Sequence, residues 1–196
     1  MVEEVITKRD KEILIWIEKY GAITINQAKI LFFNGVYDNA RRRLRILEEQ
    51  GILNSYTLKE TKEKVYCTDR KLSLHDIYIF NYIAKLKELG CRIKDIELKP
   101  RYLKDSLIPD AFVSFSYYED LYITFLEVDY KHATEILKFK SSYERLYREK
   151  DKHKEFQGTF PIIVVAGFSK NVRYNSANFN TVWTTLDYSK LDELLL

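Results

Sequence analysis

Apolar residues at spacings of three and four predict helices in the first fifty residues. Thr7 and Asp10 have the spacing of a capping box, and the helix that they begin is predicted to end at Gly21. A second capping box, Thr24 with Gln27, begins a shorter helix. Both of these helices therefore start at a side chain able to cap their exposed amide groups.

A third helix is predicted over residues 37–50, with one apolar face and one basic face. Ala40, Leu44 and Leu47 share the apolar face, since they recur at spacings of four and three. Two β-prone runs follow around a polar, lysine-rich tip, a pattern typical of a hairpin. Three helices followed by a hairpin is the order of a winged helix-turn-helix domain, which we expect over residues 1–70.

The remaining residues, 71–196, combine helix and strand patterns. Ser73 caps a predicted fourth helix, and three runs with strand character follow it, among them "DAFVSFSY" and "LYITFLEV". A long helix is predicted over residues 133–156, with Leu137 and Tyr143 on its apolar, core-facing side. It precedes the buried-strand pattern "PIIVVAG" and a final strand, "TVWTTL". We therefore expect an α+β protein of two domains.

The composition is that of a folded protein. Hydrophobic residues make up 46% of the 196 residues and charged residues 31%, with six Gly and three Pro, which excludes disordered and collagen-like classes. The longest apolar runs are too short to cross a bilayer, and residues 1–10 lack the apolar core of a secretion signal. Cys67 and Cys91 have no paired spacing, which indicates reduced thiols. We expect a cytoplasmic protein without a membrane partner.

Basic residues gather at two places, although the net charge is only +3. Residues 37–47 contain four Arg and one Asp, and residues 138–154 contain seven basic and three acidic residues. In the third helix the arginines lie away from the apolar face, where they can enter a major groove. We expect base-edge contacts from Asn39, Arg42 and Arg45, and phosphate contacts from Arg41, Arg43, Lys62 and Lys64. A basic surface helix in a protein-binding domain is the alternative interpretation.

Three carboxylates are predicted to meet near the strand ends of the second domain. Asp110 follows Pro109 at the start of one strand, and Glu127 and Asp129 end the next. Glu127 and Asp129 are two residues apart, so they share one face, and Asp110 on an antiparallel neighbour can reach them. Oxygen ligands of this kind suit Mg²⁺ or Mn²⁺. The alternative is that these are ordinary polar residues at strand ends.

The order of elements and these motifs resemble the PD-(D/E)xK nuclease fold, whose core is αβββαβ. Pro109-Asp110 matches the PD element, and Glu127-Val128-Asp129 occupies the place of (D/E)xK. The segment "PDAFV…FLEVDYKHATEILKFKSSYERL" resembles the replication-relaxation family of plasmid and mobile-element proteins, which joins a winged helix to a PD-(D/E)xK-like domain. The resemblance implies Asp110, Glu127 and Asp129 as metal ligands and, with Lys138, as the catalytic residues of an active member.

One position departs from the nuclease motif. Asp129 stands where the motif has a lysine that orients the attacking water and stabilises charge on the phosphate. An aspartate does neither, so we expect a degenerate nuclease-like domain with weak or absent cleavage. A lysine from beyond the strand could take the place of the missing one, and the candidates are Lys131, Lys138 and Lys140. The resemblance favours Lys138, because migrated lysines in that family usually come from the following helix.

These features favour a sequence-specific DNA-binding protein of a plasmid or mobile element that acts in replication or in DNA transfer and relaxation. Double-stranded DNA is the expected partner, together with other plasmid replication or transfer proteins. We expect a homodimer, because palindromic DNA sites favour two-fold proteins and the chain ends in the apolar segment "LDELLL". Two alternatives stay open: a Mg²⁺-dependent endonuclease and a dimeric transcriptional regulator.

Overall fold

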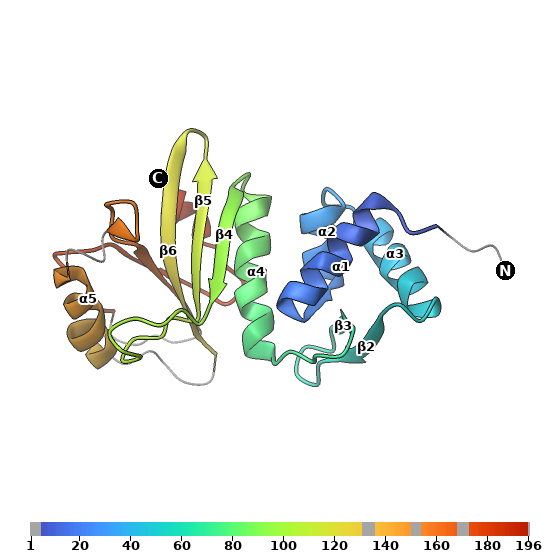
Figure 1. Cartoon of the computed structure of the whole chain (residues 1–196), viewed down its shortest axis with the longest axis horizontal. Coiled ribbons are helices and arrows are strands. Elements are labelled where there is room, and N and C mark those ends of the chain that lie inside the picture. The colour runs from blue at the N-terminus through green and yellow to red at the C-terminus, as the bar shows by residue number, and fades with distance from the viewer. Residues whose placement is uncertain (1–4, 131–135, 150–153, 168–172, 196) are drawn as a thin grey trace. The chain divides into compact units, whose positions relative to one another are not determined.

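The computed structural model describes residues 5–130, 136–149, 154–167 and 173–195 (Figure 1). It contains helices and β-sheets, so the chain is a mixed α+β protein. The chain divides into two compact units, Met1–Phe80 and Asn81–Leu196, hereafter the N-terminal and C-terminal units. The division lies within helix α4 (Leu74–Glu88), whereas the sequence pattern places the boundary after residue 70, before that helix. Among the described helices, none is both long and apolar enough to cross a membrane.

The N-terminal unit combines helices with a small antiparallel sheet. Its elements along the chain are α1 (Lys8–Tyr20), β1 (Ala22–Thr24), α2 (Ile25–Phe32), α3 (Tyr37–Glu49), β2 (Asn54–Thr57) and β3 (Lys64–Cys67). The helices and the β2–β3 hairpin appear where the sequence predicts them. The sequence pattern misses β1, because three residues are too few to show strand periodicity. This strand pairs with β3, which lies between β1 and β2 in the sheet.

Both predicted capping boxes are confirmed. The Thr7 hydroxyl accepts a hydrogen bond from the Asp10 amide at 3.2 Å, and the Asp10 carboxylate accepts one from the Thr7 amide at 2.6 Å. Thr24 and Gln27 make the same reciprocal pair at 3.1 and 3.0 Å. Gly21 ends α1 with a φ of 101°, a conformation that strongly favours glycine. Local side-chain chemistry thus sets where α1 and α2 begin.

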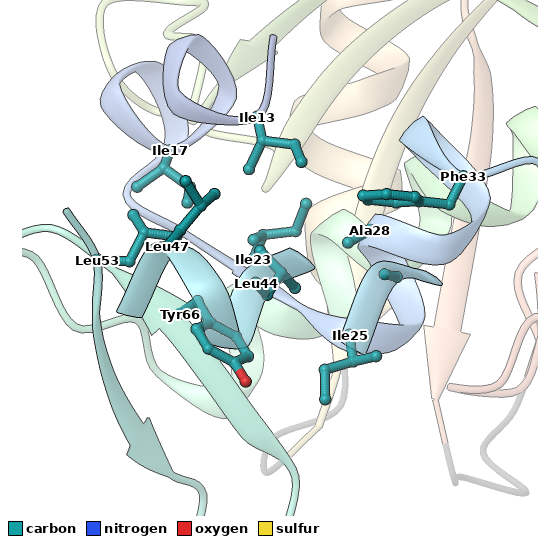
Figure 2. Close-up of a cluster of buried hydrophobic side chains, with 11 residues drawn as sticks. Ile13, Ile17, Ile23, Ile25, Ala28, Phe33, Leu44, Leu47, Leu53 and Tyr66 are labelled. Atoms are coloured by element: carbon teal, nitrogen blue, oxygen red, sulfur yellow. The ribbon is translucent and has the colours of Figure 1, made fainter. Parts of the chain in front are cut away.

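The apolar face of α3 packs into the core of the N-terminal unit, as its spacing predicts. Ala40, Leu44 and Leu47 are all fully buried. In Figure 2 Leu44 and Leu47 lie among apolar side chains from α1, including Ile13 and Ile17. Because this face is fixed against the core, the opposite face of α3 is left for solvent or a partner.

The C-terminal unit is built on a mixed sheet. Its described strands are β4 (Arg92–Leu98), β5 (Ala111–Tyr117), β6 (Asp120–Asp129), β7 (Ile162–Gly167) and β8 (Thr181–Thr184), which are neighbours in that order. The pairs from β4 to β6 are antiparallel, and the pairs from β6 to β8 are parallel. The predicted order of a helix, strands, a helix and further strands is confirmed for the described elements.

Side chains pack against both faces of this sheet. On one face, Phe125 of β6 and Tyr143 belong to a buried aromatic cluster, with ring centroids 5.9 Å apart. On the other face, the hydroxyl of Tyr82 in α4 lies 3.0 Å from that of Thr124. Thr124 and Phe125 are neighbours on β6, so their side chains point to opposite faces. The sheet is therefore a central layer between helical layers.

The helix after β6 is shorter than predicted. Its predicted start within residues 131–135 lies outside the described residues. The described part passes through a π-helical segment, η1 (Lys138–Tyr143), into α5 (Glu144–Arg148). Glu149 leaves the helical conformation with a ψ of 76°, and residues 155–156 form a turn rather than the predicted end of a long helix.

The structure corrects the predicted burial of Leu137 and shows where one of the C-terminal leucines lies. Leu137, predicted on the buried face of the helix, is 68% exposed, and Phe139 is fully buried in its place. Phe139 lies four residues before Tyr143 and shares its face, whereas Leu137 does not. Leu191, one of the leucines behind the dimer prediction, is fully buried in the short 3₁₀ helix η3 (Leu191–Leu195). The side chain of Leu194 and residue 196 lie outside the described residues.

Candidate functional site

The outward face of α3 carries the predicted DNA-contacting residues. Asn39, Arg41, Arg42 and Arg45 are all exposed there. A shallow depression of about 500 Å³ lies on this face, lined by Asp38, Arg41, Arg42, Arg45, Ile46 and Glu49. The structure thus brings Arg41, Arg42 and Arg45 to one solvent-facing depression, whereas Asn39 lines a separate hollow.

Some basic residues on or near α3 are already paired with acids. The Arg45 guanidinium lies 2.7 Å from Glu49 one turn later, and this hydrogen bond raises the pKa of Arg45. Lys64 lies 2.6 Å from Glu48, and its hydrogen bond lowers the pKa of that carboxyl. Both pairs offset positive charge that the sequence assigned to DNA.

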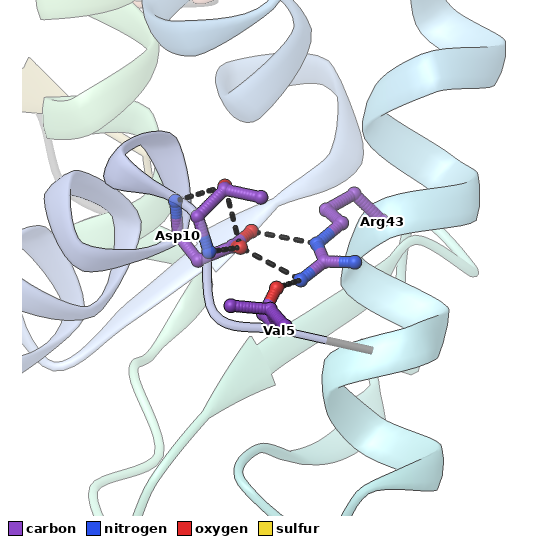
Figure 3. Close-up of polar contacts among 4 residues, drawn as sticks. Val5, Asp10 and Arg43 are labelled. Atoms are coloured by element: carbon purple, nitrogen blue, oxygen red, sulfur yellow. Dashed lines mark hydrogen bonds and ion pairs between the residues drawn. The ribbon is translucent and has the colours of Figure 1, made fainter. Parts of the chain in front are cut away.

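Arg43 faces the N-terminus of α1 rather than the exposed surface (Figure 3). Its Nε and Nη2 each donate to the Asp10 carboxylate at 2.7 Å, and Nη2 also donates to the Val5 carbonyl at 3.2 Å. The Asp10 side chain is fully buried, and that of Arg43 is 16% exposed. Burial works against ionisation of Asp10, but hydrogen bonds from Arg43 and Thr7 outweigh it and lower its pKa. Arg43 therefore links α3 to α1, a role that no local sequence pattern indicates.

Arg41, Arg42 and Lys62 are placed differently. All three are exposed, and within the described ranges none forms an ion pair or hydrogen bond with another side chain. Lys62 lies in the turn between β2 and β3, with a φ of 58°. These residues keep their positive charge available for a partner.

The second candidate site centres on Glu127, near the end of β6. The residue is 3% exposed. The Lys138 ammonium lies 2.6 Å from Oε1 and 2.7 Å from Oε2, and it also donates to the Ile108 carbonyl at 3.2 Å. The Tyr143 hydroxyl donates a hydrogen bond to Oε1. One buried carboxylate is thus held by two side chains from the following helix.

The π-helical turn explains how both side chains reach Glu127. Lys138 and Tyr143 are five residues apart, which in an α-helix places side chains about 140° apart around the axis. The wider turn of η1, with its i→i+5 bonding, brings residues at this spacing toward one face. The sequence predicts that Tyr143 lies in the core. It is fully buried, and its contact with Glu127 had no signal in the sequence.

Asp110 lies beside the same strand end, as its predicted antiparallel position requires. Its Oδ2 accepts a hydrogen bond from the Val128 amide at 2.8 Å. Burial, assisted by the negative charge of Asp110, raises the pKa of Glu127 to about 7 despite the opposing effects of Lys138 and Tyr143. The structure therefore brings Asp110, Glu127 and Lys138 together.

Asp129 is buried against β7, where it is paired in register with Gly167. Within the described ranges, no group of three or more His, Cys, Asp or Glu side chains is arranged to hold a metal ion. The metal centre predicted at Asp110, Glu127 and Asp129 therefore stays a prediction, and we assign no metal to it. Lys140 is exposed, and Lys131 lies outside the described residues.

In comparisons with known proteins, no family model, curated protein or solved structure matches the chain.

Proposed function

We propose that the chain is a DNA-binding protein that presents the outward face of α3 to a duplex. The observation that carries the proposal is the pair Arg41 and Arg42. Both are exposed and have no acidic partner within the described residues. An α-helix fits the major groove, where arginine can donate two hydrogen bonds to a guanine.

The order of elements in the N-terminal unit supports this proposal. A helix, a short strand, two helices and a hairpin follow one another, and the short strand pairs with the hairpin. This is the order of a winged helix-turn-helix domain, with α3 in the place of the recognition helix. Lys59 and Lys62 are exposed at the tip of the β2–β3 hairpin, where a wing contacts phosphate.

We assign a non-catalytic role to the C-terminal unit. The proximity of Asp110, Glu127 and Lys138 fits descent from a PD-(D/E)xK-like domain, in line with the resemblance found in the sequence. The Lys138 ammonium is committed to Glu127 and to the Ile108 carbonyl. In this proposal the unit supports assembly of a homodimer at the replication or transfer origin of a plasmid or mobile element.

Salt-dependent binding to duplex DNA tests the proposal. The purified chain is titrated into labelled random duplex and into sequences enriched from a random library, at several salt concentrations. Arg41→Ala/Arg42→Ala should weaken binding to the enriched site by about 1–3 kcal/mol for the lost base contact of Arg42, with the lost phosphate contact of Arg41 in addition. Arg92→Ala/Lys94→Ala removes the same charge from exposed positions of β4 and is the matched control.

Three outcomes separate the candidate functions. Binding by the wild type that falls in the α3 variant and persists in the β4 variant supports the proposal. No binding by the wild type, or equal losses in the two variants, overturns it. Strand cleavage that appears only with added Mg²⁺ would instead assign the endonuclease function.

A further inference from the structure

A second hollow, distinct from the depression on α3, lies where α1 begins beside α3. Its volume is about 310 Å³, and its lining includes Arg9, Phe33, Asn39 and Arg42. Arg9 was not singled out in the sequence, because it belongs to α1, far along the chain from the arginine row. Arg42 contributes to both hollows, so they adjoin one another.

The charge in this hollow, hereafter the Arg9 notch, is positive among the described residues. Asp10 also lines it, but its carboxylate is bound by both ends of the Arg43 guanidinium fork. That ion pair cancels one negative and one positive charge. Arg9 and Arg42 then remain as the uncompensated charges, with the Asn39 amide as a neutral donor and acceptor.

The Arg9 guanidinium lies over the Phe33 ring. The guanidinium carbon lies 4.8 Å from the centre of the Phe33 ring, and Phe33 itself is 5% exposed and therefore fixed in the core. A guanidinium that rests on a ring by its face keeps its N–H donors free at its edge. These donors match the oxygens of a phosphate in geometry and charge.

We propose that the Arg9 notch binds a backbone phosphate of the DNA whose major groove receives α3. The inference rests on the proposed DNA-binding function and adds a contact from outside α3. A phosphate contact fixes the orientation of the protein on the duplex and carries no sequence information. Arg9 thus positions the reading helix and does not read bases.

The experiment compares Arg9→Gln with Lys11→Gln in the full chain. Lys11 is an exposed residue of the same helix that does not line the notch, so its loss controls for net charge. Arg9→Gln should lower affinity roughly tenfold, as for a lost charge-assisted hydrogen bond. It should also reduce the slope of log K against log salt by about 0.9, the share of one phosphate. Lys11→Gln should change both quantities much less.

Sequence dependence provides the second readout. Arg9→Gln should weaken binding to enriched and random duplexes by the same factor, whereas Arg42→Ala should weaken the enriched site more. If the wild type binds DNA but Arg9→Gln behaves as Lys11→Gln does, the notch proposal is overturned and the DNA-binding function stands. If the wild type shows no salt-dependent binding, both proposals are overturned. Circular dichroism of each variant confirms that the fold is retained.

Discussion

Replacing Arg43 with methionine should destabilise the N-terminal unit, although the sequence alone marks this residue as a DNA contact. The arginine holds a fully buried carboxylate by two hydrogen bonds of 2.7 Å. Methionine keeps much of the side-chain volume and removes the donors. Asp10 would then be a buried carboxylate without its cationic partner, which is a strongly unfavourable arrangement.

The magnitude follows from the burial of the two side chains. Removing one partner of a buried ion pair typically costs about 3–5 kcal/mol. Arg43 is 16% exposed, so water can reach part of the vacated space. The Thr7 hydroxyl and amide still donate to Asp10 in the variant. We therefore expect a loss of about 2–3 kcal/mol in the free energy of unfolding, below the usual range for a fully buried pair.

The loss should depend on pH in a defined direction. Hydrogen bonds from Arg43 and Thr7, acting against burial, keep the folded-state pKa of Asp10 below its value in the unfolded chain. Asp10 therefore contributes stability above the unfolded pKa, about 3.9, and this contribution disappears as pH falls through the folded pKa. The difference between wild type and Arg43→Met should be largest near neutral pH and should shrink in acid.

Urea unfolding followed by Trp16 fluorescence measures the effect in the N-terminal unit, with Trp183 replaced by Phe in every variant. Arg45→Met is the matched control, because Arg45 is on the same helix and both side chains of its ion pair with Glu49 are exposed to solvent. Exposed pairs of this kind contribute little. Equal destabilisation by Arg43→Met and Arg45→Met at neutral pH, or a loss that does not change with pH, would refute the reasoning.

Two further predictions concern the C-terminal unit. The folded-state pKa of Glu127, about 7, is above its ordinary value of 4.5, so the folded state binds the extra proton and the free energy of unfolding should fall as pH rises between these values. Glu127→Gln should flatten this dependence of stability on pH, measured by urea unfolding followed by Trp183 fluorescence. An unchanged slope would contradict the raised pKa of Glu127. A Cβ on Gly167 would lie 2.7 Å from the Cβ of Asp129. Gly167→Ala should therefore force β6 and β7 apart locally and lower the free energy of unfolding by about 1–3 kcal/mol. An unchanged melting temperature would contradict this prediction.

The features that the sequence predicts well are those encoded by neighbouring residues. Thr7 with Asp10 and Thr24 with Gln27 mark helix starts, because a capping box joins residues only three apart. The buried face of α3 follows from the spacing of Ala40, Leu44 and Leu47 for the same reason. The proximity of Asp110 to the end of β6 is also predictable, since adjacent antiparallel strands of the right length leave few alternatives.

The features that the sequence misses depend on residues far apart or on irregular backbone. Arg43 pairs with Asp10, 33 residues earlier, and no local pattern distinguishes it from Arg42 beside it. The contact of Tyr143 with Glu127 depends on a π-helical turn, which the apolar periodicity does not reveal. The apolar side chain of Leu137 predicts burial, but apolar character alone does not decide which face of a helix a residue occupies.

Charge pairing decides how strongly the proposed DNA surface can interact with phosphate. The sequence of α3 contains a row of arginines, but several of the predicted DNA-contacting cations are paired with acids in the structure. The pairs are Arg43 with Asp10, Arg45 with Glu49 and Lys64 with Glu48. A cation already paired with a carboxylate must give up that partner before it can neutralise a phosphate, so it adds less to the salt dependence of binding. The uncompensated charge near α3 then rests mainly on Arg41, Arg42 and, from α1, Arg9. In the proposed function, a surface with few free cations would bind random DNA weakly, so tight binding to one site would have to come from base contacts and from the reading helix of a second copy in the proposed homodimer.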